Sequence, residues 1–106
     1  MQTIIIKIDS RELKNADLDI RYVLPDVLAE YTGNKVTDNG YDYIDSSGCE
    51  LGIWLSTDDA IKNYPFVIEY IKNHLVCEND LSLSAEIFIS EKESVDLEEC
   101  QKVYPI

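Results

Sequence analysis

The chain has 106 residues, which suits one globular domain, and 45% of them are hydrophobic, which argues against wholesale disorder. Its 21 acidic residues outnumber 9 lysines and arginines, so the formal net charge at pH 7 is -12. Nucleic acids and anionic membranes require a basic surface, so this charge excludes both as expected partners and favours a cationic one.

The opening MQTIIIKIDS predicts a cytoplasmic protein, because an apolar run of three isoleucines is too short for a signal peptide. No later stretch approaches the roughly 20 apolar residues that a membrane span needs. Residues 3–8 are rich in isoleucine and predict a strand that ends at the Asp9-Ser10 turn.

A first helix is expected from Ile20, because apolar residues recur every three or four positions as far as Tyr31. Pro25 lies inside this segment and would delay the start of the helix or kink it. Residues 17–24 would also suit a strand, because their hydrophobicity alternates. Gly33 and Asn34 supply a stop signal.

Residues 35–45 and 50–56 predict a β-hairpin whose turn contains residues 46–48. A second helix should follow, because Ser56 and Asp59 have the spacing of a capping box. Its expected apolar residues recur with helical periodicity and are Ile61, Tyr64, Ile68, Ile71 and Leu75.

The last part of the chain contains a strand pattern, an acidic loop and a short tail. Residues 81–89 alternate between apolar and polar and predict the clearest strand of the chain. Residues 91–99 predict a loop, and the closing CQKVYPI predicts an additional edge strand that ends at Pro105.

The expected order of strand, helix, strand, strand, helix and strand is the split βαβ, or ferredoxin-like, arrangement. We therefore expect a single α+β domain over residues 1–106, with two helices on one face of an antiparallel sheet. The open face would carry Ile5, Trp54 and Phe88. Three covers could shield this face from solvent: the tail through Val103 and Tyr104, a second copy of the protein, or a different partner.

Acidic residues concentrate in two segments. Residues 37–59 hold six acids and no base, and residues 78–99 hold eight acids against Lys92 alone. The remaining residues are close to neutral. This concentration favours a binding surface for a positively charged protein over general solubility.

The stretch TDNGYDYID, residues 37–45, places carboxylates beside tyrosines. Tyrosine offers a wide apolar ring with a polar tip, and neighbouring acids attract lysine and arginine. Alternation separates the two tyrosines from Asp42, and which of them faces the core stays open. Charged residues that protect a sheet edge are the other explanation. The expected partner-binding residues are Asp38, Tyr41, Asp42, Tyr43, Asp45, Glu50 and Trp54.

We expect no enzyme, metal site or cofactor. A catalytic triad would have to use His74, the single histidine. The dipole at the C-terminal end of the second helix favours an imidazolium there, which accounts for His74 without catalysis. The three cysteines lack the paired spacing of a zinc site, so reduced thiols in the cytoplasm are the expectation.

The acidic chain, with the stretch EYTGNKVTDNGYDYID and the ending KVYPI, resembles small acidic bacterial proteins, some of which are immunity partners of toxins. The resemblance implies stoichiometric inhibition of a toxin whose active surface is basic, typically a nuclease. The expected function is therefore non-enzymatic binding that neutralises a basic protein partner. The alternative is a homodimeric regulatory or small-ligand-binding module that uses the open sheet face.

Overall fold

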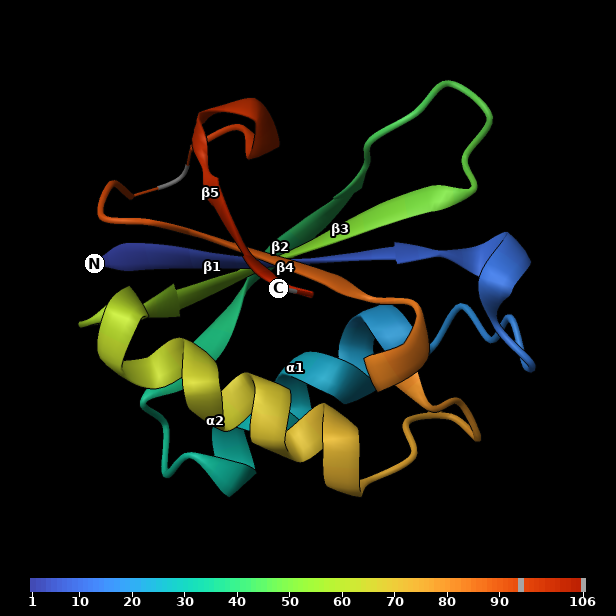
Figure 1. Cartoon of the computed structure of the whole chain (residues 1–106), viewed down its shortest axis with the longest axis horizontal. Coiled ribbons are helices and arrows are strands. Elements are labelled where there is room, and N and C mark those ends of the chain that lie inside the picture. The colour runs from blue at the N-terminus through green and yellow to red at the C-terminus, as the bar shows by residue number, and fades with distance from the viewer. Residues whose placement is uncertain (94, 106) are drawn as a thin grey trace.

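The computed structural model describes residues 1–93 and 95–105, which form one five-stranded antiparallel sheet and two α-helices (Figure 1). The strand order is β2-β3-β1-β4-β5. The first four strands and both helices have the predicted ferredoxin-like arrangement, and β5 is the predicted extra edge strand. The elements are β1 (Gln2–Asp9), α1 (Ile20–Tyr31), β2 (Val36–Tyr43), β3 (Glu50–Thr57), α2 (Ala60–Asn73), β4 (Glu86–Ser90) and β5 (Gln101–Tyr104).

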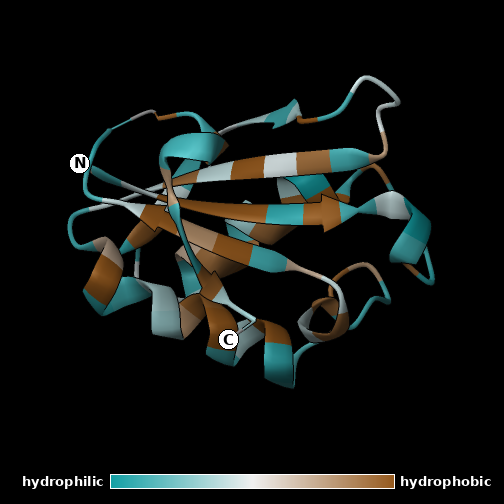
Figure 2. Cartoon of the chain, turned by 45° about the horizontal axis from the view of Figure 1, so that its top comes forward, coloured by the Kyte–Doolittle hydropathy of each residue, from teal (hydrophilic) through white to brown (hydrophobic). Residues whose placement is uncertain are grey.

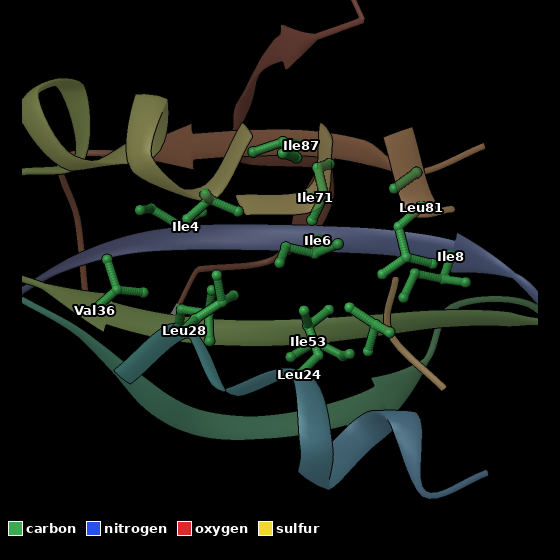
Figure 3. Close-up of a cluster of buried hydrophobic side chains, with 14 of the residues drawn as sticks. Ile4, Ile6, Ile8, Leu24, Leu28, Val36, Ile53, Ile71, Leu81 and Ile87 are labelled. Carbon is green, nitrogen blue, oxygen red and sulfur yellow. The ribbon is translucent and has the colours of Figure 1, made fainter. Parts of the chain in front are cut away.

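The main core lies between the sheet and the helices, on what we call the helical face. Every second residue of β1 points to this face, because side chains alternate along a strand. Figure 3 shows these isoleucines among the side chains of both helices and the adjoining strands. The largest fully buried members include Ile4, Ile6, Ile8, Leu24, Leu28, Ile53, Ile71 and Ile87. Figure 2 shows hydrophobic residues concentrated along the strands and helices, whereas the loops are mainly hydrophilic.

Helix α1 begins at Ile20 and continues through Pro25, so residues 20–24 are helical rather than extended. Pro25 is buried within the helix, although it cannot donate a backbone hydrogen bond. Gly33 and Asn34 both adopt positive φ, at 63° and 65°, which confirms the predicted stop. Neither helix in the described ranges is long and apolar enough to cross a membrane.

Helix α2 begins later than the predicted capping box requires. Ser56 lies in β3, and the N-cap is Asp59, whose side chain accepts a hydrogen bond from the backbone nitrogen of Lys62. Ile61 is exposed, and Leu75 is exposed and lies beyond the end of the helix, so these two residues of the predicted apolar pattern do not belong to its buried side. The buried side chains of α2 are Ala60, Asn63, Val67 and Ile71.

The strand predicted over residues 81–89 is too long, because β4 comprises only Glu86–Ser90. A short 3-10 turn occupies Leu81–Leu83, and the Asp80 side chain accepts a hydrogen bond from the backbone nitrogen of Ser82. Such local side-chain bonds compete with strand pairing. Leu81 is buried in the core, whereas Leu83 is exposed.

The opposite face, which we call the outer face, is covered by the segment that follows β4. Figure 1 shows this segment, coloured orange to red, on the side of the sheet away from the helices. The Thr3 hydroxyl donates to the Lys92 carbonyl at 2.8 Å, and Ile5 is fully buried beneath this side of the sheet. The tail through Val103 and Tyr104 was one of the three possible covers; in the structure both residues pack against the main core, and β5 pairs with β4 as an edge strand.

Candidate partner-binding surface

A one-residue bulge shapes the β2–β3 hairpin, which carries all seven predicted partner-binding residues. Asp38 pairs with Leu55 and Tyr41 pairs with Ile53, so β2 contains one more residue than β3 between these two pairs. Gly40 lies in the bulge with φ of +95°, a conformation that favours glycine. The bulge therefore sets which way the following side chains point.

The two tyrosines and Asp42 lie on opposite faces of the sheet. Tyr41 and Tyr43 pair with Ile53 and Leu51, whose side chains are buried on the helical face. The tyrosine rings therefore lie beside α1 and remain about two-fifths exposed. Asp42 pairs with Gly52 and points to the outer face, where Trp54 also lies.

Two adjoining hollows on the outer face bring the two acidic segments of the sequence together. Their volumes are about 300 and 240 Å³, and Asp42, Trp54 and Asp96 line both. Glu98 lines the smaller hollow. We call these four residues and the space between them the acidic groove.

Trp54 is held in the floor of this groove from two sides. Its indole nitrogen donates a 2.8 Å hydrogen bond to the carbonyl oxygen of Val95. Gly52 leaves room for the ring, because a Cβ at that position would lie 2.5 Å from Cζ3 of Trp54. The half-buried indole is thus preorganised, which lowers the entropy cost of using it as a contact.

Asp45 serves the hairpin turn. Its carboxylate accepts hydrogen bonds from the Ser47 hydroxyl and from the backbone nitrogen of Glu50, the latter at 3.0 Å. These two hydrogen bonds hold the pKa of Asp45 below its ordinary value, and the bond from the Ser47 hydroxyl contributes more than the bond from the Glu50 amide. Asp45 therefore stabilises the turn of the hairpin through these hydrogen bonds.

Glu50 belongs to a row of charges across the outer face of the sheet. Lys7 lies 3.3 Å from a Glu50 oxygen and 3.4 Å from a Glu86 oxygen, and Lys102 lies 2.7 Å from Glu86. The hydrogen bond from Lys102, supported by Lys7, lowers the pKa of Glu86. Much of the charge of Glu50 is therefore compensated within the chain.

The helical side of the hairpin carries a cluster that the sequence analysis missed: Arg21, Tyr22, Tyr41 and Tyr43, which we call the tyrosine–arginine cluster. The Arg21 guanidinium lies 5.0 Å from the Tyr22 ring centre and 4.9 Å from that of Tyr41. These two rings meet edge to face at 5.9 Å. Burial alone would lower the pKa of Arg21, but the three phenol groups outweigh it and raise that pKa. The cluster is therefore electrostatically coupled.

Nε of Arg21 is buried and has no hydrogen-bond acceptor among the described residues. An unsatisfied buried donor costs about 1–3 kcal/mol, so this geometry is unfavourable in the isolated chain. Arg21 and Tyr22 were missed because each appears in the sequence only as a helix residue. The βαβ arrangement, which lays α1 beside β2, was the one available signal.

In residues 1–93 and 95–105, no three His, Cys, Asp or Glu side chains are grouped as metal ligands. Burial raises the pKa of the Cys77 and Cys100 thiols, which disfavours the nucleophilic thiolate. His74 stacks on Tyr70 with ring centres 4.2 Å apart, at the C-cap of α2.

We compared the chain with protein-family models, with curated proteins and with solved structures, and none of them matches. The functional assignment therefore depends on the geometry and charge of the surfaces described above.

Proposed function

We propose that this protein is a non-enzymatic binding protein that captures a basic protein partner at the acidic groove. The supporting observation is that two acidic segments, separate in the sequence, meet there: Asp42 comes from one, and Asp96 and Glu98 come from the other. Carboxylates around an aromatic floor attract lysine and arginine and offer them apolar contact as well.

The residues of the hairpin would contribute in different ways. Trp54 is the anchor, because its ring is large and already held in place. Asp42, with Asp96 and Glu98, increases the association rate by attracting a positive surface. Tyr41 lines the larger hollow and Tyr43 the smaller one, but their rings lie on the helical face, so a partner that extends around the edge of β2 would contact the rings as well.

The resemblance to immunity proteins suggests a toxin as the partner, such as a nuclease with a basic active surface. Carboxylates in the groove would take the positions that substrate phosphates occupy, and the bound protein would block access to the active surface. The alternative, a homodimer through the outer face, has less support, because the segment that contains Val95 already covers part of that face and Ile5 is fully buried.

The test compares two triple variants of equal net charge. The groove variant carries Asp42→Asn, Asp96→Asn and Glu98→Gln. The control variant carries Glu12→Gln, Asp26→Asn and Glu30→Gln, exposed acids that do not line the groove. A protein retained by the immobilised wild-type chain from a lysate of the native host is identified, purified and titrated calorimetrically against all three chains.

The expected partner is basic, and its affinity falls with added salt. The groove variant should bind at least about tenfold more weakly, because several contacts in one surface are removed together, and the control should bind like the wild type. Equal weakening in both variants would show that only the total charge matters, and retention of no basic protein would contradict the proposal.

A further inference from the structure

Exposed apolar side chains gather on the helical side of the hairpin, around Arg21. Leu18 is 60% exposed, Tyr22 49% and Tyr41 40%. Leu18 and Tyr43 line the same small hollow, and the Tyr22 and Tyr41 rings are in contact, so the patch is continuous. Tyrosine and arginine are the residues that most often dominate the energy of protein interfaces.

Arg21 at the centre of this patch has no carboxylate at ion-pair distance in the described part of a chain that holds 21 acids. By contrast, the other arginine of the sequence, Arg11, lies 2.7 Å from an Asp9 oxygen. Stacking against Tyr22 and Tyr41 holds the Arg21 guanidinium in place, and its Nε is buried without an acceptor. The guanidinium is hydrogen-bonded to the Tyr43 side chain but has no carboxylate partner among the described residues. A guanidinium fixed in this way suits an incoming carboxylate.

We propose that a second copy of this chain supplies that carboxylate, in a two-fold dimer formed by the tyrosine–arginine cluster and Leu18. Asp38 is exposed on the helical face of β2, the same face as Tyr41, because both pair with residues buried on that side. A two-fold axis between Arg21 and Asp38 places each guanidinium against the carboxylate of the other copy.

The edge of β2 favours side-chain contact over strand addition in this dimer. The bulge between Asp38 and Tyr41 interrupts the regular row of backbone groups that a neighbouring strand would need. The interface uses the helical side of the hairpin, whereas the proposed partner site uses Asp42 and Trp54 on the outer face. The dimer therefore goes beyond the proposed function and does not depend on it.

Salt dependence separates the two proposals. Two copies with a net charge of -12 each repel one another, and added salt screens this repulsion, so dimerisation should strengthen. Capture of a basic partner should weaken under the same change, because salt screens an attraction. The failure of one proposal therefore leaves the other open to its own test.

The experiment is sedimentation velocity on the full chain, from micromolar to millimolar concentration and from low to high salt. The variants are Arg21→Glu, Asp38→Arg and, as a control outside the patch, Leu83→Ser, which removes a more exposed leucine. Circular dichroism verifies that each variant is folded, and Arg21→Gln replaces Arg21→Glu if the latter unfolds.

We expect the wild type and Leu83→Ser to dimerise alike, and each charge variant alone to dimerise at least about tenfold more weakly. An equimolar mixture of Arg21→Glu and Asp38→Arg should recover the dimer, because both pairs across the two-fold axis are then opposite in charge. A wild type that is monomeric under every condition, unchanged dimerisation of Arg21→Glu, or a mixture that stays monomeric would overturn the inference.

Discussion

The indole nitrogen of Trp54 donates a 2.8 Å hydrogen bond to the carbonyl oxygen of Val95. This bond joins the centre of β3 to the segment after β4 and closes one side of the acidic groove. Asp96 follows Val95 directly and Glu98 lies two residues further along, so the positions of both relative to Asp42 depend on this bond.

Trp54→Phe should loosen the segment that carries Asp96 and Glu98. Phenylalanine keeps an aromatic floor but cannot donate to Val95, and loss of one such bond costs about 1 kcal/mol. Hydrogen-exchange mass spectrometry should show faster exchange over residues 95–100, with little change in α1. Unchanged protection there would mean that packing alone holds the segment.

Gly52→Ala should displace the Trp54 ring, because the new methyl group would lie 2.5 Å from Cζ3. Overpacking of this kind costs about 1–3 kcal/mol, which urea unfolding measures, and tryptophan fluorescence should shift. Ser56→Ala, on the same face of β3, is the control and should change little. Combining Gly52→Ala with Trp54→Ala should cost less than the sum of the single changes, because the clash is then absent. Strict additivity would contradict this explanation.

Asp59→Ala should destabilise α2, because the Asp59 carboxylate caps the backbone nitrogen of Lys62 at 3.1 Å. Loss of an N-cap costs about 0.5–2 kcal/mol in the free energy of unfolding. Asp19→Ala at the start of α1 is the matched control, since the Asp19 side chain makes no capping hydrogen bond. Equal losses in the two variants would point to a general charge effect.

Glu86 should make stability depend on pH in the acid range. Its native pKa is lowered by the hydrogen bond from Lys102 and by Lys7, relative to an ordinary value of 4.5. A lowered native pKa gives a contribution that is fully present above the unfolded-state pKa and is lost as pH falls through the native one. Urea unfolding between about pH 3 and about pH 7 should therefore show a flatter acid decline for Glu86→Gln than for the wild type. Glu91→Gln, which removes an exposed glutamate, should retain the wild-type slope.

Local periodicity was sufficient to predict most elements of this fold. The alternating isoleucines of β1 and the helical spacing from Ile20 each reflect which side of one element is buried, and that information lies in adjacent residues. The pattern failed over residues 81–89, where the Asp80 side chain supports a turn that alternation does not reveal.

The hairpin shows why the candidate site was only partly predictable. Counted from the buried Val36, strict alternation would put Asp42 on the helical face and both tyrosines on the outer face. The extra residue of the bulge reverses this assignment, because the side-chain period of a strand is two. Hydrophobicity alone does not mark the bulge.

The sequence by itself determined the α+β class, the ferredoxin-like order of the first four strands and the acidic composition. Only the tertiary structure decided that Asp42 meets Asp96 and Glu98 across Trp54, and that Arg21 lies between Tyr22 and Tyr41. These arrangements join residues that are distant in the chain. Their contacts depend on strand register and on how segments cross the sheet, which no local pattern encodes.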